Sequence, residues 1–205
     1  MRQYLMELIG TFFLTLAVSI TGNPIAVGLM FMAMYYIGEN VSGGYYNPVL
    51  AVAGWMRGAL PVEEMLIFAG VQSIGAFFGV WLFRVLTNNA FMPDVMADLS
   101  MGMAILIEVL LSAVLALVFL TVATSKDYKG SVVNGVVIGL TLASVLFVGS
   151  GIVNPAIAAG SYLGQLFVDG GALSRELLFV YIAAPLVGGV LAALTYDYLH
   201  HPHKK

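Results

Sequence analysis

The 205-residue sequence contains no cysteine, which excludes disulfide bonds, thiolate metal sites and cysteine nucleophiles. Charge is also scarce, because only 9% of the residues are Asp, Glu, Lys or Arg, against about 25% in soluble domains. We find no catalytic triad, phosphate-binding loop or metal-ligand cluster in the sequence. An enzyme is therefore not expected, and neither is a cofactor, a bound metal or a nucleic-acid partner.

Apolar residues dominate instead, at 60% of the chain, with a mean hydropathy of +0.97. They occur in long unbroken runs and do not alternate with polar residues, so they predict membrane-spanning helices and not the strands of a membrane barrel. The first run contains Glu7 and is preceded only by Arg2, so we interpret it as a retained span and not a signal peptide. The sequence predicts a single transmembrane domain over 1–205.

Counting roughly 20 apolar residues per span predicts six full spans and two shorter helices. The full spans are expected at 4–22, 25–40, 64–85, 101–124, 131–148 and 174–198. The shorter helices, at 47–57 and 154–164, are long enough to cross only half of a bilayer. An all-α membrane protein with two re-entrant half-helices is therefore predicted.

Each half-helix begins with Asn-Pro, at Asn47-Pro48 and Asn154-Pro155, after a glycine-containing stretch. Asn is a good N-cap and Pro suits the first helical turn, where its missing N–H is not needed. One such pair could be an ordinary turn, but two at matching places favour a pore. The helix N-termini would then place partial positive charge at the membrane centre, which repels cations but not neutral hydrogen-bonding solutes.

Glu7 and Glu108 lie inside predicted spans, and each opens a half of the chain that later reaches Asn-Pro. The halves, about 1–95 and 96–199, contain three spans each and would insert as an inverted repeat. A carboxylate within a span suggests function, and one alternative is an ion-coupled secondary transporter in which Glu7 or Glu108 titrates. The other is structural, with each Glu accepting backbone N–H groups of a loop buried at membrane depth.

The basic residues indicate the orientation, since cytoplasmic loops are enriched in Lys and Arg. Cytoplasmic termini place most of them inside and only two outside, and the opposite topology reverses this bias. The inner set is Arg2, Arg57, Lys126, Lys129, Lys204 and Lys205, and the outer set is Arg84 and Arg175. We expect a plasma (inner) membrane protein with cytoplasmic termini and a short basic tail at 200–205.

These motifs together resemble the aquaporins, or major intrinsic proteins. The resemblance covers nearly the whole chain and is carried by Glu7-Leu8-Ile9-Gly10-Thr11-Phe12-Phe13, Ser42-Gly43-Gly44 with Asn47-Pro48, Glu108, Ala123-Thr124, and Gly151 with Asn154-Pro155-Ala156. It implies six tilted helices and two half-helices around one pore per subunit, a homotetramer, and cytoplasmic termini.

The sequence departs from this family at three places. The first motif has Val49 where the second has Ala156, and Tyr45 stands where the family often has His. Ile157 occupies the position that usually carries the Arg of the outer constriction. The other residues of that constriction are, by the family's spacing from the Asn residues, Val27, Leu142 and Gly151.

This quartet matches neither the Phe, His, small residue and Arg of water-selective members nor the Trp, Gly, Phe and Arg of glycerol facilitators. Loss of the Arg and of an aromatic ring should widen the constriction and make it aliphatic. We therefore expect a passive channel for water or small uncharged solutes, such as glycerol-like molecules, ammonia, or metalloid hydroxides including arsenite. A broad, unselective or poorly conducting pore is the alternative reading of Ile157.

Overall fold

The computed structural model describes residues 1–93, 99–125, 127–128, 130–149, 151–170 and 175–200, and the regular structure in these ranges is entirely helical. The helices are α1 (Arg2–Thr21), α2 (Pro24–Ser42), α3 (Pro48–Met56), α4 (Val62–Thr87), α5 (Met101–Phe119), α6 (Asn134–Gly149), α7 (Pro155–Gly164), α8 (Arg175–Leu178) and α9 (Ala184–His200). Three π-helical segments extend or join them: Leu120–Thr124 (η1), Gln165–Asp169 (η2) and Phe179–Ala183 (η3).

Five of the helical segments are long and apolar enough to cross a membrane: Arg2–Thr21, Pro24–Ser42, Val62–Thr87, Met101–Thr124 and Glu176–His200. The sixth predicted span, α6, is apolar but has only 16 residues. It begins at Asn134 and not at residue 131, because the Asn134 side chain donates to the carbonyls of Val122 and Tyr128 and holds the preceding turn. The chain is an integral, multi-pass membrane protein, and the predicted fold class is confirmed.

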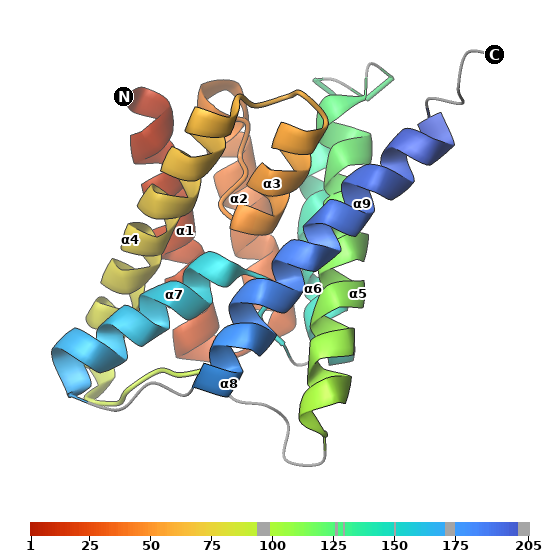
Figure 1. Ribbon diagram of the computed structural model, residues 1–205. Coiled ribbons are helices and arrows are strands. Elements are labelled where there is room, and N and C mark those ends of the chain that lie inside the picture. Colours follow the sequence, from red (N-terminus) through yellow and green to blue (C-terminus); the bar gives the residue numbers. More distant parts are fainter. Residues whose placement is uncertain (94–98, 126, 129, 150, 171–174, 201–205) are drawn as a thin grey trace.

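The helices contact one another in the same pattern in both halves. Helix α1 packs along α4 as α5 packs along α9, while α2 and α6 meet between them. Close approach needs glycine at matching places. A Cβ atom on Gly75 of α4 would collide with the carbonyl of Leu8, and one on Gly188 of α9 with the carbonyl of Val109. The two short helices are exchanged between halves, since α3 lies against α9 and α7 against α4 (Figure 1).

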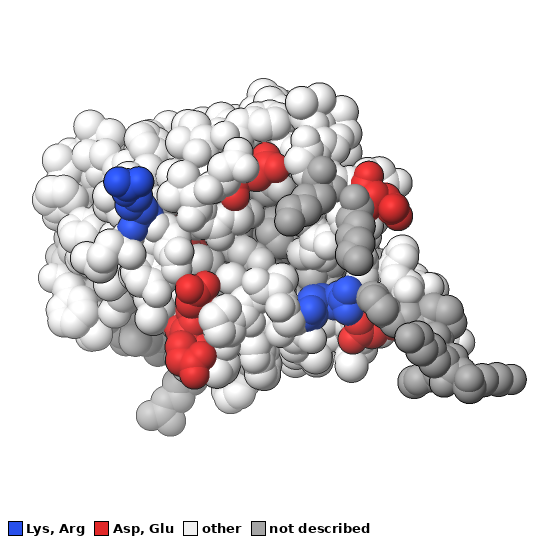
Figure 2. Space-filling view, turned by 90° about the horizontal axis from the view of Figure 1, so that it is seen from above, with Lys and Arg blue, Asp and Glu red and all other residues white. Residues whose placement is uncertain are grey.

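The start of α1 and the end of α9 lie at the same end of the bundle (Figure 1), which we call the termini face. Figure 2 shows this face, where the described acidic and basic side chains are scattered. Arg57, the C-cap of α3, pairs there with Asp197 of α9. Its guanidinium lies over the Tyr196 ring, 4.5 Å from the ring centroid. The predicted inner residues Lys126, Lys129, Lys204 and Lys205, and most of the predicted tail, lie outside the described residues.

Candidate functional site: a pore between two half-helices

The half-helices α3 and α7 begin at the two Asn residues. The Asn47 Oδ1 atom accepts the Val49 N–H at 2.9 Å, and the Asn154 Oδ1 atom accepts the Ala156 N–H at 3.1 Å. Pro48 and Pro155 occupy the first helical position in each case. Val49 and Ala156 are completely buried, so the departure from the usual motif at Val49 is a packing change.

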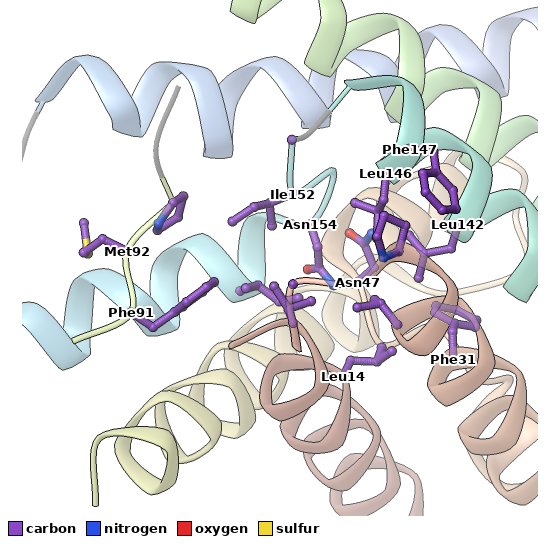
Figure 3. Close-up of a pocket in the computed structure, with 17 residues that line it drawn as sticks. Leu14, Phe31, Asn47, Phe91, Met92, Leu142, Leu146, Phe147, Ile152 and Asn154 are labelled. Carbon is purple, nitrogen blue, oxygen red and sulfur yellow. The ribbon is translucent and has the colours of Figure 1, made fainter. Parts of the chain in front are cut away.

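The two Asn side chains also join the loops to each other. The Asn47 Nδ2 atom donates to the carbonyl of Val153 at 2.8 Å, and the Asn154 Nδ2 atom donates to the carbonyl of Tyr46 at 3.0 Å. An amide group has two N–H donors, so each Asn retains a second one beyond this bond. The two Asn residues lie side by side at one cavity (Figure 3), where the second donor is available to a passing solute.

The residue before each Asn has an unusual backbone conformation. Tyr46 has φ 51° and Val153 has φ 46°, in the left-handed region that bulky and β-branched residues rarely adopt. Such residues cost of order 1–3 kcal/mol and persist only where their surroundings hold them. Here the carbonyls accept from the opposite Asn, and the N–H groups donate to buried carboxylates.

Glu7 is the acceptor for the first loop. Its Oε1 atom accepts from the Ser42 hydroxyl at 2.6 Å and the Tyr45 N–H at 3.0 Å. Its Oε2 atom accepts from the Tyr46 N–H at 2.6 Å and the Gln72 amide at 2.7 Å. The carboxylate is fully buried and all four bonds hold protein groups, as the structural alternative requires.

Glu108 is the acceptor for the second loop and has two partners among the residues that the structure describes. Its two oxygens accept the N–H groups of Ile152 at 2.9 Å and Val153 at 3.0 Å. A Cβ atom on Gly151 would collide with the Glu108 carboxylate, so glycine is needed there for the loop to approach. Neither carboxylate is among the described residues that line the cavity beside the two Asn residues.

The cavity beside the two Asn residues, which we call the outer cavity, has a volume of about 380 Å³. Gly22 and Pro24, at the junction of α1 and α2, line it, so it lies toward the end of the bundle away from the termini face. All four residues expected at the outer constriction, Val27, Leu142, Gly151 and Ile157, line it together with both Asn residues. Val27 comes from α2, Leu142 from α6 and Ile157 from the first turn of α7. No described lining residue carries a charged side chain, so its polarity comes from the Asn amides and the backbone.

Sequence reasoning missed several lining residues. Phe31 and Leu146 lie one helical turn from Val27 and Leu142, and the i, i+4 spacing could have found them. Phe91 belongs to the connection after α4, where no periodicity indicates position (Figure 3). It is held there by an edge contact with Phe83, at 6.2 Å between ring centroids.

Comparison with known proteins identifies the family. Residues 15–196 match the family model described as major intrinsic protein. The chain belongs to the major intrinsic protein family. Members of this family are channels and not enzymes, so the chain is a passive membrane channel for water or small solutes.

Relatives within the major intrinsic protein family are named for different solutes. The chain is 32% identical to glycerol uptake facilitator protein-like 6 of Lactiplantibacillus plantarum, over 94% of this chain and 95% of that protein. It is 30% identical to aquaporin AqpM of Methanothermobacter marburgensis, over 87% and 78% respectively. The structure superimposes on an aquaglyceroporin from Plasmodium falciparum with a TM-score of 0.84, covering 98% of this chain and 97% of that one. At 20% identity this last match concerns the fold alone.

Proposed function

We propose that the protein conducts small uncharged solutes, such as water, ammonia, glycerol-like molecules or metalloid hydroxides including arsenite, through an aliphatic filter without arginine. The observation that carries this proposal is the cavity in which Val27, Leu142, Gly151 and Ile157 meet the two Asn amides. The relative named as a glycerol uptake facilitator supports solutes larger than water.

The chemistry of the outer cavity suits neutral solutes. At the inner end of this cavity, a solute meets two helix N-termini and two amide donors. Their partial positive charge repels cations and hydronium. Without the fixed guanidinium, solutes meet aliphatic side chains and a glycine at the outer end. Such a lining accommodates hydroxylated or methylated molecules that need few donors.

Ion-coupled transport through Glu7 or Glu108 is the alternative, and the described contacts give it no support. Both carboxylates are buried and accept hydrogen bonds from loop groups, and neither lines the outer cavity. A proton or ion relay needs a carboxylate that meets the transported species.

We further propose a homotetramer in the plasma (inner) membrane with cytoplasmic termini. The charge bias of the sequence supports this orientation. The wholly apolar groove between α1 and α4, lined by Leu8, Phe12, Phe78 and Trp81, provides a surface suited to lipid or a neighbouring subunit.

Ile157→Arg tests the filter. Its guanidinium would extend toward Val27 and Leu142, narrowing the cavity and repelling cations. We expect a strong loss of glycerol and arsenite flux, with a smaller loss of water flux, in stopped-flow assays on proteoliposomes of matched protein density. Ile157→Met is the control, because it changes side-chain shape without adding charge.

Two outcomes would contradict this filter assignment. Unchanged glycerol and arsenite fluxes in Ile157→Arg would show that Ile157 does not face the solute. Wild-type fluxes that follow an imposed proton or sodium gradient would favour the transporter. An equal loss of every flux is separated from filtering by measuring folded protein recovered from the same vesicles.

A further inference from the structure

A second cavity lies at the termini face, on the far side of the Asn residues from the outer cavity. Its volume is about 200 Å³, and its lining includes Tyr35, Glu39, Tyr45, Phe119 and Thr124. It shares no described lining residue with the outer cavity. Aromatic rings line both cavities: Phe31, Phe91 and Phe147 line the outer one, and Tyr35, Tyr45 and Phe119 line the inner one, which also has the polar side chains of Glu39 and Asn40.

The chain itself links these cavities through one short loop. Tyr45 lines the inner cavity, and Asn47, two residues later, lines the outer one. Tyr46 lies between them and is completely buried. A solute path from the Asn amides to the termini face through the second cavity would therefore run past Tyr45.

The Tyr45 ring is fixed from several sides. Its centroid lies 5.0 Å from that of Phe119 and 5.8 Å from that of Phe68, and only 5% of the residue is exposed. Gly43 and Gly54 make room for it, since a Cβ atom on Gly54 would lie 2.7 Å from the ring. A ring packed this closely does not rotate aside at low cost, because protein cores have little free volume.

We propose that Tyr45 and Phe119 form an inner aromatic constriction that sets the size limit for solutes, while the aliphatic outer ring is the wider point. Water and ammonia pass it, and polyols such as glycerol are retarded there. This inference rests on the proposed channel function and assigns its size selection to a different place. It also gives a role to Tyr45, which stands where the family often has His.

The test measures glycerol and water permeability in the same proteoliposomes and compares their ratio between variants. Tyr45→Ala and Phe119→Leu each remove aromatic bulk from the inner lining, and we expect the glycerol-to-water ratio to rise about tenfold. Phe78→Leu is the matched control, because Phe78 is exposed and is not among the described residues that line either cavity. Leu142→Ala widens the outer ring instead. In the control variant the ratio should stay within about twofold of wild type, and in Leu142→Ala it should rise less than in the two inner variants.

The outcomes separate the constriction from the channel itself. A raised ratio in Leu142→Ala, with none in Phe119→Leu, would place size selection at the outer ring and overturn the inference. If Tyr45→Ala does not fold, Phe119→Leu decides alone, since it preserves most of the packed volume. A wild-type protein that carries neither water nor ammonia above protein-free vesicles would contradict the channel function, and this inference with it.

Discussion

The two re-entrant loops have the same backbone design but unequal support. The first is held by Glu7 through four hydrogen bonds, two from loop N–H groups and two from the side chains of Ser42 and Gln72. Among the described residues, Glu108 holds the second loop through two loop N–H groups. Two loop N–H groups bound to a buried carboxylate are therefore common to both halves, and side-chain donors are described at Glu7.

The missing donors can be traced to matching positions. Ser42 lies five residues before Asn47, and Gly149, five residues before Asn154, has no side chain to donate. Gln72 precedes the contact glycine Gly75 of α4 by three residues, as Pro185 precedes Gly188 of α9. The residues at these two positions therefore differ between the halves. The backbone bonds common to both are the essential part, and the side-chain donors are additional.

The largest expected difference comes from neutralising each carboxylate. In Glu7→Gln the new NH₂ group faces two donors whichever oxygen it replaces, whereas in Glu108→Gln it faces one. Each orphaned buried group costs about 1–3 kcal/mol. We expect Glu7→Gln to lower the melting temperature in detergent by about 10 °C, and Glu108→Gln by half as much.

Thermal unfolding followed by fluorescence-detected size exclusion measures this pair, with wild type as the reference. Equal shifts would mean that the Ser42 and Gln72 bonds contribute nothing. Normal stability combined with loss of gradient-dependent flux would instead revive the transporter alternative.

Replacing either Asn by Asp should have the same effect in both loops. Asn47→Asp and Asn154→Asp each keep the cap but replace the Nδ2 donor by an oxygen that faces the carbonyl of the opposite loop. Each also puts a negative charge at the inner end of the outer cavity, where the helix N-termini no longer suffice to repel cations. We expect sodium or proton leak in both, of similar size, together with a stability loss of about 1–3 kcal/mol.

Ion leak is measured with vesicles loaded with a pH-sensitive or sodium-sensitive dye. Asn→Ser at each position serves as the uncharged control, since it shortens the side chain and removes the bond between loops without adding charge. A leak in only one Asp variant would show that the two caps do not meet the solute equivalently.

The smallest effect should come from converting the first loop to the pattern of the second. Gln72→Leu removes one donor to Glu7 and also removes the Gln72 Oε1 atom, which is buried without a hydrogen bond. These effects oppose each other, so a destabilisation below about 1 kcal/mol is expected. Ser42→Ala, which loses only a donor, should cost slightly more. A melting-temperature loss as large as that of Glu7→Gln would contradict the division into essential and additional bonds.

The sequence predicted best those features that depend on residues close together in the chain. An N-cap followed by Pro is defined within a few residues, so both half-helix starts were predicted correctly. Apolar runs predicted the spans for the same reason. The positions of Val27, Leu142, Gly151 and Ile157 came from family spacing, and their role as a filter stays a prediction.

What sequence could not supply depends on tertiary contacts. Gln72 binds Glu7 across 65 residues, and no periodicity pairs these two side chains in advance. Phe91 reaches the outer cavity from an irregular connection, where neither a 3.6-residue period nor a turn motif fixes direction. Tyr45 was recognised as a departure from the family, but its packing between Phe68 and Phe119 is visible only in the fold.

The reciprocal bonds of the two Asn side chains have a consequence for biosynthesis. Asn47 finds its acceptor, the Val153 carbonyl, 106 residues later in the chain. At about 5–20 residues per second, translation delivers that partner roughly 5–20 s after Asn47 has been made. During this interval the first loop cannot complete its hydrogen bonds, so it must wait in water or against the insertion machinery. The bonds that join the two loops can therefore form only after the second loop has been made, late in the synthesis of the chain.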